Sequence, residues 1–178
     1  MSIIIRNNFR NPKNSWIVNP LCNWEINPKR NWQNDPKRNW QIHPKRNWEI
    51  DPKRNWQIDP VRNWQVNPAR NWQINSARNW QVNPARNYTI NPNNVNFKGL
   101  YVVKKSSLEC DYYLVKTVLS NVLLGYDEGN NYTFLLIGVN NVYSIYNNEI
   151  KYIGYLCPNS KGGYNWFDIN GNWVYFLV

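Results

Sequence analysis

The sequence predicts an all-β protein in which an N-terminal β-solenoid of octapeptide repeats is followed by a small antiparallel β domain, either a meander, a sandwich or a partly closed barrel. Three observations lead to this fold class. An eight-residue unit recurs through the first half of the chain. Nearly every unit contains a proline, which excludes a continuous helix. The second half consists of short aromatic and β-branched runs separated by Asn and Gly, which indicate strands and turns. We therefore expect a repeat domain over residues 1–92 and a β domain over residues 93–178.

The repeated unit reads Asn/Asp-Pro-Lys/Ala-Arg-Asn-Trp-Gln/Glu-Ile/Val. Proline and the residue before it favour extended or turn conformations. We therefore expect a short strand over Arg-Asn-Trp-Gln-Ile and a turn over Asn-Pro and the following residue. In a strand, Arg, Trp and Ile lie on one face. The pattern thus predicts a solenoid core formed by Trp16, Trp24, Trp32, Trp40, Trp48, Trp56, Trp64, Trp72, Trp80 and Tyr88.

A single octad is not stable alone. Burying its Trp and Ile contributes at most about 6–8 kcal/mol, whereas ordering eight residues costs about 8–16 kcal/mol of backbone entropy. Stacked octads stabilise one another, so we expect solenoid coils of about 16 residues, or about 24 in the three-sided alternative. Ladders of Asn side-chain amides are expected along the stack. In its period alone, the octad resembles short-repeat β-solenoids, and this resemblance implies an architecture without implying an activity.

The net positive charge is confined to the repeats. Residues 1–92 carry 15 Lys and Arg against 5 Asp and Glu, whereas the remainder carries 6 of each. A basic half of this kind is compatible with polyanionic partners. Two interpretations remain open for the arginines in the acid-free stretch: they lie against Trp and cap turn carbonyls, or they bind a polyanion. These arginines are Arg62, Arg70, Arg78 and Arg86.

Eight hydrophobic runs in the second half are expected to form strands. Asn170-Gly171 is the strongest hairpin signal among the turns between them. A helix with an apolar stripe from Leu108 to Val122 is an alternative, but the density of β-branched residues favours strands. This domain is expected either to cap the open edge of the solenoid or to bind a partner. A hairpin with cross-strand aromatic pairs, or else an exposed aromatic binding patch, is expected at Tyr164, Trp166 and Trp173.

The sequence contains no recognisable motif for catalysis, and we predict no catalytic residue, no metal site and no cofactor. Its one histidine, His43, occupies the Asn/Asp position of an octad. Cys22, Cys110 and Cys157 are odd in number and widely spaced, which argues against a disulfide framework and against a metal site. We expect these cysteines to be buried or idle thiols.

The leading functional hypothesis is therefore a non-enzymatic structural or protein-interaction protein, with a protein partner or self-assembly through the N-terminal end of the solenoid. The alternative hypothesis is binding of nucleic acid or an acidic glycan along the Arg62 to Arg86 row. The chain contains neither a signal-peptide pattern nor an apolar run long enough to span a membrane. By default we expect a cytoplasmic protein without membrane insertion, with secretion by a signal-less route as an alternative.

Overall fold

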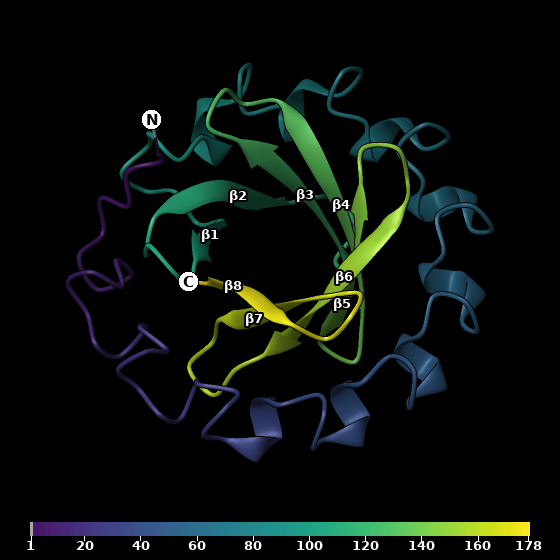
Figure 1. Cartoon of the computed structure of the whole chain (residues 1–178). Coiled ribbons are helices and arrows are strands. Elements are labelled where there is room, and N and C mark those ends of the chain that lie inside the picture. The colour runs from purple at the N-terminus through teal and green to yellow at the C-terminus, as the bar shows by residue number, and fades with distance from the viewer. Residues whose placement is uncertain (1) are drawn as a thin grey trace.

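The computed structural model describes residues 2–178 and contains a closed antiparallel β-barrel surrounded by a ring of tight turns (Figure 1). The strands pair in sequence order, and β1 pairs with β8 to close the barrel. The predicted all-β class and all eight predicted strand regions are confirmed, and the alternative helix is absent from this region. The strands are β1 (Leu100–Lys104), β2 (Cys110–Lys116), β3 (Val122–Asp127), β4 (Tyr132–Val139), β5 (Val142–Asn147), β6 (Tyr152–Pro158), β7 (Tyr164–Asp168) and β8 (Trp173–Leu177).

The barrel strands are apolar on both faces, and each face belongs to a separate core. Alternate residues point inward and fill the barrel interior with Val, Leu, Ile, Phe and Trp side chains, including Phe134 and Trp166. Their neighbours point outward and form a second core against the ring, including Tyr113 and Tyr146. Strands buried on both faces read as nearly continuous hydrophobic runs, which is the pattern of the second half of the sequence.

The hairpins that join these strands depend on Asn, Asp and Gly. Asn140 and Asn141 both have positive φ, 52° and 63°, in the two-residue turn between β4 and β5. Such turns match the twist of the paired strands. In the β7–β8 turn, the Asp168 carboxylate accepts hydrogen bonds from the backbone N–H groups of Asn170 and Asn172, and Gly171 has a φ of 81°.

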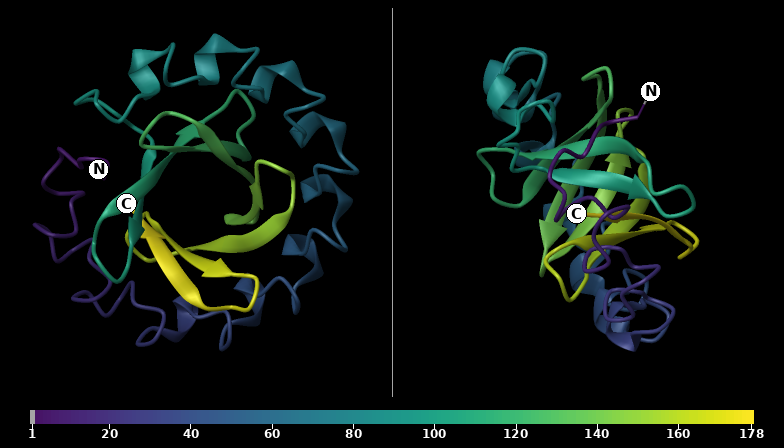
Figure 2. Two further views of the ribbon diagram at one scale, coloured as in Figure 1. Left: turned by 45° about the horizontal axis from the view of Figure 1, so that its top comes forward. Right: turned by 90° about the vertical axis from the view of Figure 1, so that its left-hand side faces the viewer.

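The repeats form two tight turns per octad and no strands. A turn that begins at Asn/Asp-Pro alternates with a short 3-10 turn over Trp-Gln-Ile. Figure 2 shows that these turns encircle the barrel as a band. The 3-10 turns are η1 (Trp32–Asn34), η2 (Trp40–Ile42), η3 (Trp48–Ile50), η4 (Trp56–Ile58), η5 (Trp64–Val66), η6 (Trp72–Ile74), η7 (Trp80–Val82) and η8 (Tyr88–Ile90).

Side-chain capping by Asn or Asp at every fourth residue explains this alternation. In one octad, the Asp51 carboxylate accepts a hydrogen bond from the Lys53 N–H at 2.9 Å, and the Asn55 amide oxygen accepts one from the Gln57 N–H at 3.1 Å. Both residues act as N-caps that satisfy N–H groups at the start of a turn. Pro52 follows the first cap directly, a position where proline is favoured because its fixed φ suits the turn and its missing N–H is not needed.

The predicted N-terminal β-solenoid is therefore wrong. The octads adopt turns instead of short strands, and the ring lies around the barrel instead of preceding a separate cap. The extended φ and ψ values at Asn55 are confined to the cap, and the Trp56–Ile58 turn follows at once. Asn amides do not form the predicted ladders, because they cap turns and bind carbonyls of the preceding octad, as Asn55 Nδ2 binds the Glu49 carbonyl. The domain division at residue 92 stays a prediction.

The ring packs its Ile and Val side chains onto the barrel and leaves its Trp side chains outside. Ile50 and Ile74 are fully buried within the core formed by the outer face of the barrel. In a 3-10 turn of about three residues per turn, the first and third residues point in different directions, whereas in a strand they share a face. The predicted Trp core is therefore wrong: exposed fractions are 51–67 % for Trp16, Trp24, Trp32, Trp40, Trp48, Trp56, Trp64, Trp72, Trp80 and Tyr88.

Barrel side chains also bind the ring through backbone carbonyls of its inward-facing residues. Through these hydrogen bonds the octads contact β7 first and β3 last, so the ring runs around the barrel in the direction opposite to the strand order. Four donors make these contacts: Asn165 Nδ2 to the Ile26 carbonyl at 3.0 Å, Cys157 Sγ to the Ile42 carbonyl at 3.4 Å, Tyr146 Oη to the Ile58 carbonyl at 2.6 Å, and Tyr126 Oη to the Val82 carbonyl.

Arg10 closes the ring. Its guanidinium donates hydrogen bonds to the carbonyls of Phe97 and Gly99, where the ring ends, and to the carbonyl of the C-terminal Val178. It also lies over the Tyr101 ring, with its Cζ 4.7 Å from the ring centroid. The beginning of the ring is thus tied to its end, and self-assembly through an open N-terminal end of a solenoid has no counterpart in this fold.

Candidate functional site

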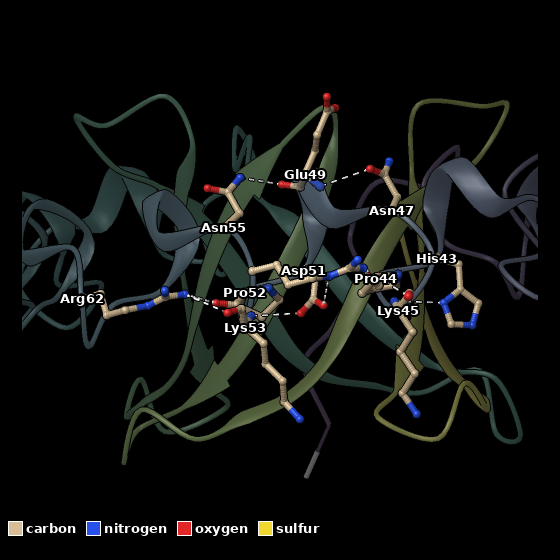
Figure 3. Close-up of polar contacts among 11 residues, drawn as sticks. His43, Pro44, Lys45, Asn47, Glu49, Asp51, Pro52, Lys53, Asn55 and Arg62 are labelled. Carbon is tan, nitrogen blue, oxygen red and sulfur yellow. Dashed lines mark hydrogen bonds and ion pairs between the residues drawn. The ribbon is translucent and has the colours of Figure 1, made fainter.

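Each octad presents one side to the barrel and four groups to solvent: the residue after Pro, the Arg, the Trp and the Gln or Glu. Pro and Ile are buried. Figure 3 shows the two edges that result: Lys45 and Lys53 extend toward one edge, and Glu49 extends toward the other. We call these the Lys edge and the Gln/Glu edge. The Arg and Trp side chains are the exposed groups shared by almost all octads.

In octads that begin with Asp, the arginine is held by its own octad and by the preceding one. Arg54 Nε donates to the Asp51 carboxylate at 2.8 Å, and Arg54 Nη2 donates to the Pro44 carbonyl at 3.2 Å. Arg62 makes the same contacts with Asp59 and with the Pro52 carbonyl, at 2.6 and 2.7 Å. The same arrangement occurs at Asp35, Arg38 and Pro28. These guanidinium groups therefore link consecutive octads of the ring.

In octads that begin with Asn, the amide takes over the contact with the preceding octad. Asn75 Nδ2 donates to the Pro68 carbonyl at 2.9 Å. That carbonyl lies seven residues before the Asn, as Pro44 lies seven residues before Asp51. In residues 2–178, no hydrogen bond or ion pair of the guanidinium groups of Arg70, Arg78 and Arg86 is found. We call residues 67–92 the Asn sector and residues 35–66 the Asp sector.

The four arginines of the predicted row therefore have two different environments. Arg62 belongs to the Asp sector and is held by Asp59, whereas Arg70, Arg78 and Arg86 have free guanidinium groups. All four are exposed, together with the neighbouring Trp side chains. Because the sequence has no acidic residue between Asp59 and Glu109, no carboxylate of this stretch can neutralise the three free arginines.

A surface groove opens at the start of the Asn sector. It has a volume of about 420 Å³, and its lining includes Trp64, Trp72 and the free Arg70. Leu119, from the loop between β2 and β3, forms part of its wall. Two exposed indole rings with an unpaired guanidinium beside them provide apolar faces and a positive charge in one place. The ring Trp side chains make no ring-stacking or cation–π contact with other described residues, so their faces are available to a ligand.

The predicted aromatic patch of the barrel is not a surface patch. Trp166 is 4 % exposed and packs in the barrel interior against Phe134, with ring centroids 5.1 Å apart. Trp173 is 8 % exposed and belongs to the core between barrel and ring. Tyr164 is half-buried at the barrel interior. The alternative explanation, aromatic packing between neighbouring strands, describes Trp166 and Tyr175, whose residues pair across β7 and β8.

The three cysteines differ in burial. Cys110 and Cys157 are buried, as expected, whereas Cys22 is exposed. Burial raises the pKa of the Cys110 thiol to about 12 and raises the pKa of the Cys157 thiol well above its usual value. Both thiols are therefore protonated at neutral pH, which makes them poor nucleophiles. His43 accepts a hydrogen bond at Nδ1 from the Lys45 N–H, so it caps a turn in place of Asn or Asp.

Two structural features of the ring surface are not predicted from the sequence. One is the set of Asn and Asp residues at every fourth position, which decide whether an arginine is held or free. Their spacing is visible in the sequence and could have been interpreted as a series of turn caps. The other is the Lys edge, whose lysines lie in equivalent positions of consecutive octads but face the barrel hairpins only in the folded ring.

Comparison of the chain with known protein families, with characterised proteins and with solved structures gave no match. Within residues 2–178, no helix has the length and apolar character needed to cross a membrane. No three His, Cys, Asp or Glu side chains of the described residues come together as metal ligands would. The function is therefore argued from the geometry and charge of the ring surface.

Proposed function

We propose that the protein binds single-stranded nucleic acid along the outer surface of the Asn sector. The observation that carries the proposal is the pairing of exposed Trp and Tyr rings with arginines that the scaffold does not use: Arg70, Arg78 and Arg86. Proteins that bind single strands without sequence preference combine a basic track with aromatic rings on which bases stack. Trp72, Trp80 and Tyr88 provide such rings, with 51–63 % of each side chain exposed.

The expected energetics follow from these two groups. Stacking of a base on an aromatic ring contributes about 1–3 kcal/mol to binding. Each phosphate contact by Arg makes the slope of the logarithm of the binding constant against the logarithm of the salt concentration steeper by about 0.7. Arginines that are already hydrogen-bonded to an Asp and a carbonyl must lose these contacts before they bind phosphate fully. The Asn sector therefore has the higher affinity of the two sectors.

Two charge-matched variants test the proposal. R70Q/R78Q/R86Q removes the free arginines, and R38Q/R54Q/R62Q removes the same number of held ones. Binding of a fluorescent oligo-thymidine single strand is measured by anisotropy over a salt series. We expect the first variant to lose about tenfold or more in affinity and about 2 units of salt slope. The second variant is expected to keep most of the affinity and to be less stable.

Equal losses in both variants would show that net charge alone is responsible, and absence of salt-dependent binding in the unmodified protein would refute the proposal. Binding of heparin without binding of the oligonucleotide would assign the site to an acidic glycan instead. The same titration is followed by acrylamide quenching of Trp fluorescence, because bound bases are expected to shield the ring indoles.

A second candidate function is non-enzymatic binding of a protein partner or of another copy of the chain. The observation in its favour is that exposed Trp side chains continue through the Asp sector, for example Trp40 and Trp56, where the octads that begin with Asp hold their arginines. Exposed aromatic rings are typical of protein interfaces. Sedimentation analysis of W40A/W56A and W72A/W80A separates the two functions: loss of self-association or partner binding in the first variant, with nucleic-acid binding retained, favours this candidate.

A further inference from the structure

A pocket opens on the Lys edge of the Asp sector, away from the proposed nucleic-acid surface. Its volume is about 440 Å³, within the range of about 300–1,000 Å³ typical of small-molecule sites. Three consecutive octads contribute Lys37, Lys45 and Lys53 to its lining. The barrel contributes Tyr152 and Tyr155 of β6, together with the β7–β8 turn at residues 169–171.

The charge of the pocket is positive. Its one carboxylate, Asp51, is already paired with Arg54 at 2.8 Å and accepts a hydrogen bond from the Lys53 N–H. The three lysines of the lining have no ion pair with any described residue. As Figure 3 shows, Lys45 and Lys53 extend side by side toward the same edge. Three ammonium groups around one opening favour a ligand that carries two or more negative charges.

Hydrogen-bond donors without a protein partner lie in the same lining. In the part of the chain that the structure describes, the hydroxyl groups of Tyr152 and Tyr155 donate to no protein atom. Burial raises the pKa of both tyrosines, so both hydroxyls remain protonated at neutral pH. His43 accepts at Nδ1, which leaves its Nε2 as the protonated ring nitrogen. Such unpaired donors are ready to bind the oxygens of an anion.

Part of the lining is apolar. Ile169, which is 51 % exposed, offers carbon surface beside the charged groups, and the largely buried Pro44 and Tyr155 ring complete the apolar side of the lining. Gly171, whose φ of 81° favours glycine, lies beside this space: a Cβ at its position would be 3.8 Å from Tyr155 Oη and 4.0 Å from Lys37 Cε. A ligand of inorganic phosphate alone would leave this surface without a contact.

We propose that this pocket binds a small phosphate monoester with a planar or apolar body. The phosphate meets Lys37, Lys45 and Lys53 and accepts hydrogen bonds from the unpaired donors, and the body lies on Tyr155 and Ile169. Lysine acts as a point charge toward phosphate oxygens. The site is separate from the Asn sector, so the proposal does not depend on the proposed nucleic-acid binding.

Calorimetric titration of the full chain with phenyl phosphate tests the proposal, with inorganic phosphate and phenol as the two halves of the probe. We expect saturable binding of phenyl phosphate and at least about tenfold weaker binding of either half. K45Q and K53Q are expected to weaken phenyl phosphate binding by about tenfold or more, and Y155F by less. K13Q is the matched control, because Lys13 occupies the same octad position and is not part of the lining of this pocket.

R70Q/R78Q/R86Q must leave phenyl phosphate binding unchanged, which distinguishes this pocket from the surface of the Asn sector. No saturable binding at about 10 mM phenyl phosphate would overturn the proposal. Equal affinity for inorganic phosphate and phenyl phosphate would also overturn it, as would a loss in K13Q as large as that in K45Q. Thermal unfolding of each variant confirms that the lysine substitutions leave the fold intact, since all these lysines are exposed.

Discussion

The Asp sector and the Asn sector share one scaffold and differ mainly at two positions of the octad: the first cap, and the residue after Pro, which is Lys in most of the Asp sector and Ala in the Asn sector. Both bury Ile or Val against the barrel, both cap two turns per octad, and both expose Trp. In the octads of the Asp sector that begin with Asp, the first cap is a carboxylate that accepts a hydrogen bond from Arg, and Arg Nη2 donates to a carbonyl of the preceding octad. In the Asn sector, the amide group reaches that carbonyl directly.

This difference explains why arginine, which is common to both sectors, has two roles. An ionised Asp cannot donate a hydrogen bond to the carbonyl of the preceding octad, so the Arg that is paired with it donates that hydrogen bond. An Asn donates itself and leaves Arg without a structural task. The replacement of one oxygen by an NH₂ group thus decides whether the surface carries a held or a free guanidinium. Four predictions test this comparison, in order of decreasing effect.

The buried layer is expected to be equivalent in the two sectors. I58A and I74A should each lower the free energy of unfolding by about 2–5 kcal/mol, because both remove buried methyl groups and leave a cavity. W56A and W72A should each lower it by less than about 1 kcal/mol, since the indoles are exposed. Chemical denaturation measures all four. A larger loss in the Trp variants would contradict the inward orientation of Ile.

Removal of the first cap is expected to have a moderate effect in either sector. D51A and N75A should each lower the free energy of unfolding by about 1–2 kcal/mol, because both remove the cap of a turn. In N75A, a carbonyl of the preceding octad also loses its hydrogen-bond donor. In D51A, the arginine that donates to that carbonyl loses the carboxylate that holds it in place. Equilibrium unfolding of the two variants, with Q57A as a control at an exposed position, measures the losses. A loss of stability in only one sector would show that the Asp cap and the Asn cap do not contribute equally to stability.

Exchange of the caps is expected to change binding more than stability. D51N/D59N should alter the free energy of unfolding by less than about 1 kcal/mol, because Asn provides both the cap and the donor. The same variant frees Arg54 and Arg62, so its affinity for single-stranded oligo-thymidine should rise and its salt slope should steepen. N67D/N75D/N83D should show the opposite changes. Unaltered affinity in both variants would break the link between cap identity and arginine availability.

The smallest effect is expected at His43, the one octad that begins with neither Asp nor Asn within the Asp sector. Burial and the nearby Arg46 lower the pKa of His43 below its usual value of 6.5. The folded state then binds fewer protons than the unfolded state, so stability is complete above pH 6.5 and declines as the pH falls below it. The melting temperature should show a small decline in this window that H43N lacks. An identical pH profile for H43N would contradict this assignment.

The barrel could be predicted from the sequence to the level of its strands. Residues such as Leu135 and Leu136 stand in a run that is apolar on both faces, and Asn140-Asn141 marks the turn that follows. Closure could not be predicted, because pairing of β1 with β8 depends on the register and twist accumulated over eight strands. The second apolar face of each strand, seen at Leu135, was the sign that something had to cover the barrel.

The geometry of the ring could not be predicted, because the eight-residue period of the sequence is equally compatible with short strands. Asn55 and Trp56 fit a strand in isolation, and a Trp in every octad is a natural core residue. The barrel surface decides otherwise, since it covers Ile58 and leaves Trp56 outside. The sequence indicates that Arg70, Arg78 and Arg86 lack a nearby acid, and the structure places all three on the surface; their role in binding a polyanion stays a prediction. That Arg62 is held whereas the other three are free depends on contacts between neighbouring octads, and these contacts cannot be derived from the sequence pattern.

The central claim is that the ring turns its Ile side chains to the barrel and its Trp side chains to solvent. Acrylamide quenching of Trp fluorescence in the native protein tests it most directly. Nine of the eleven Trp residues lie in the octads and are exposed, and only Trp166 and Trp173 are buried. We expect red-shifted emission that is mostly accessible to acrylamide, with a small protected fraction. Blue-shifted emission that acrylamide hardly quenches would place the indoles in a core and contradict the account.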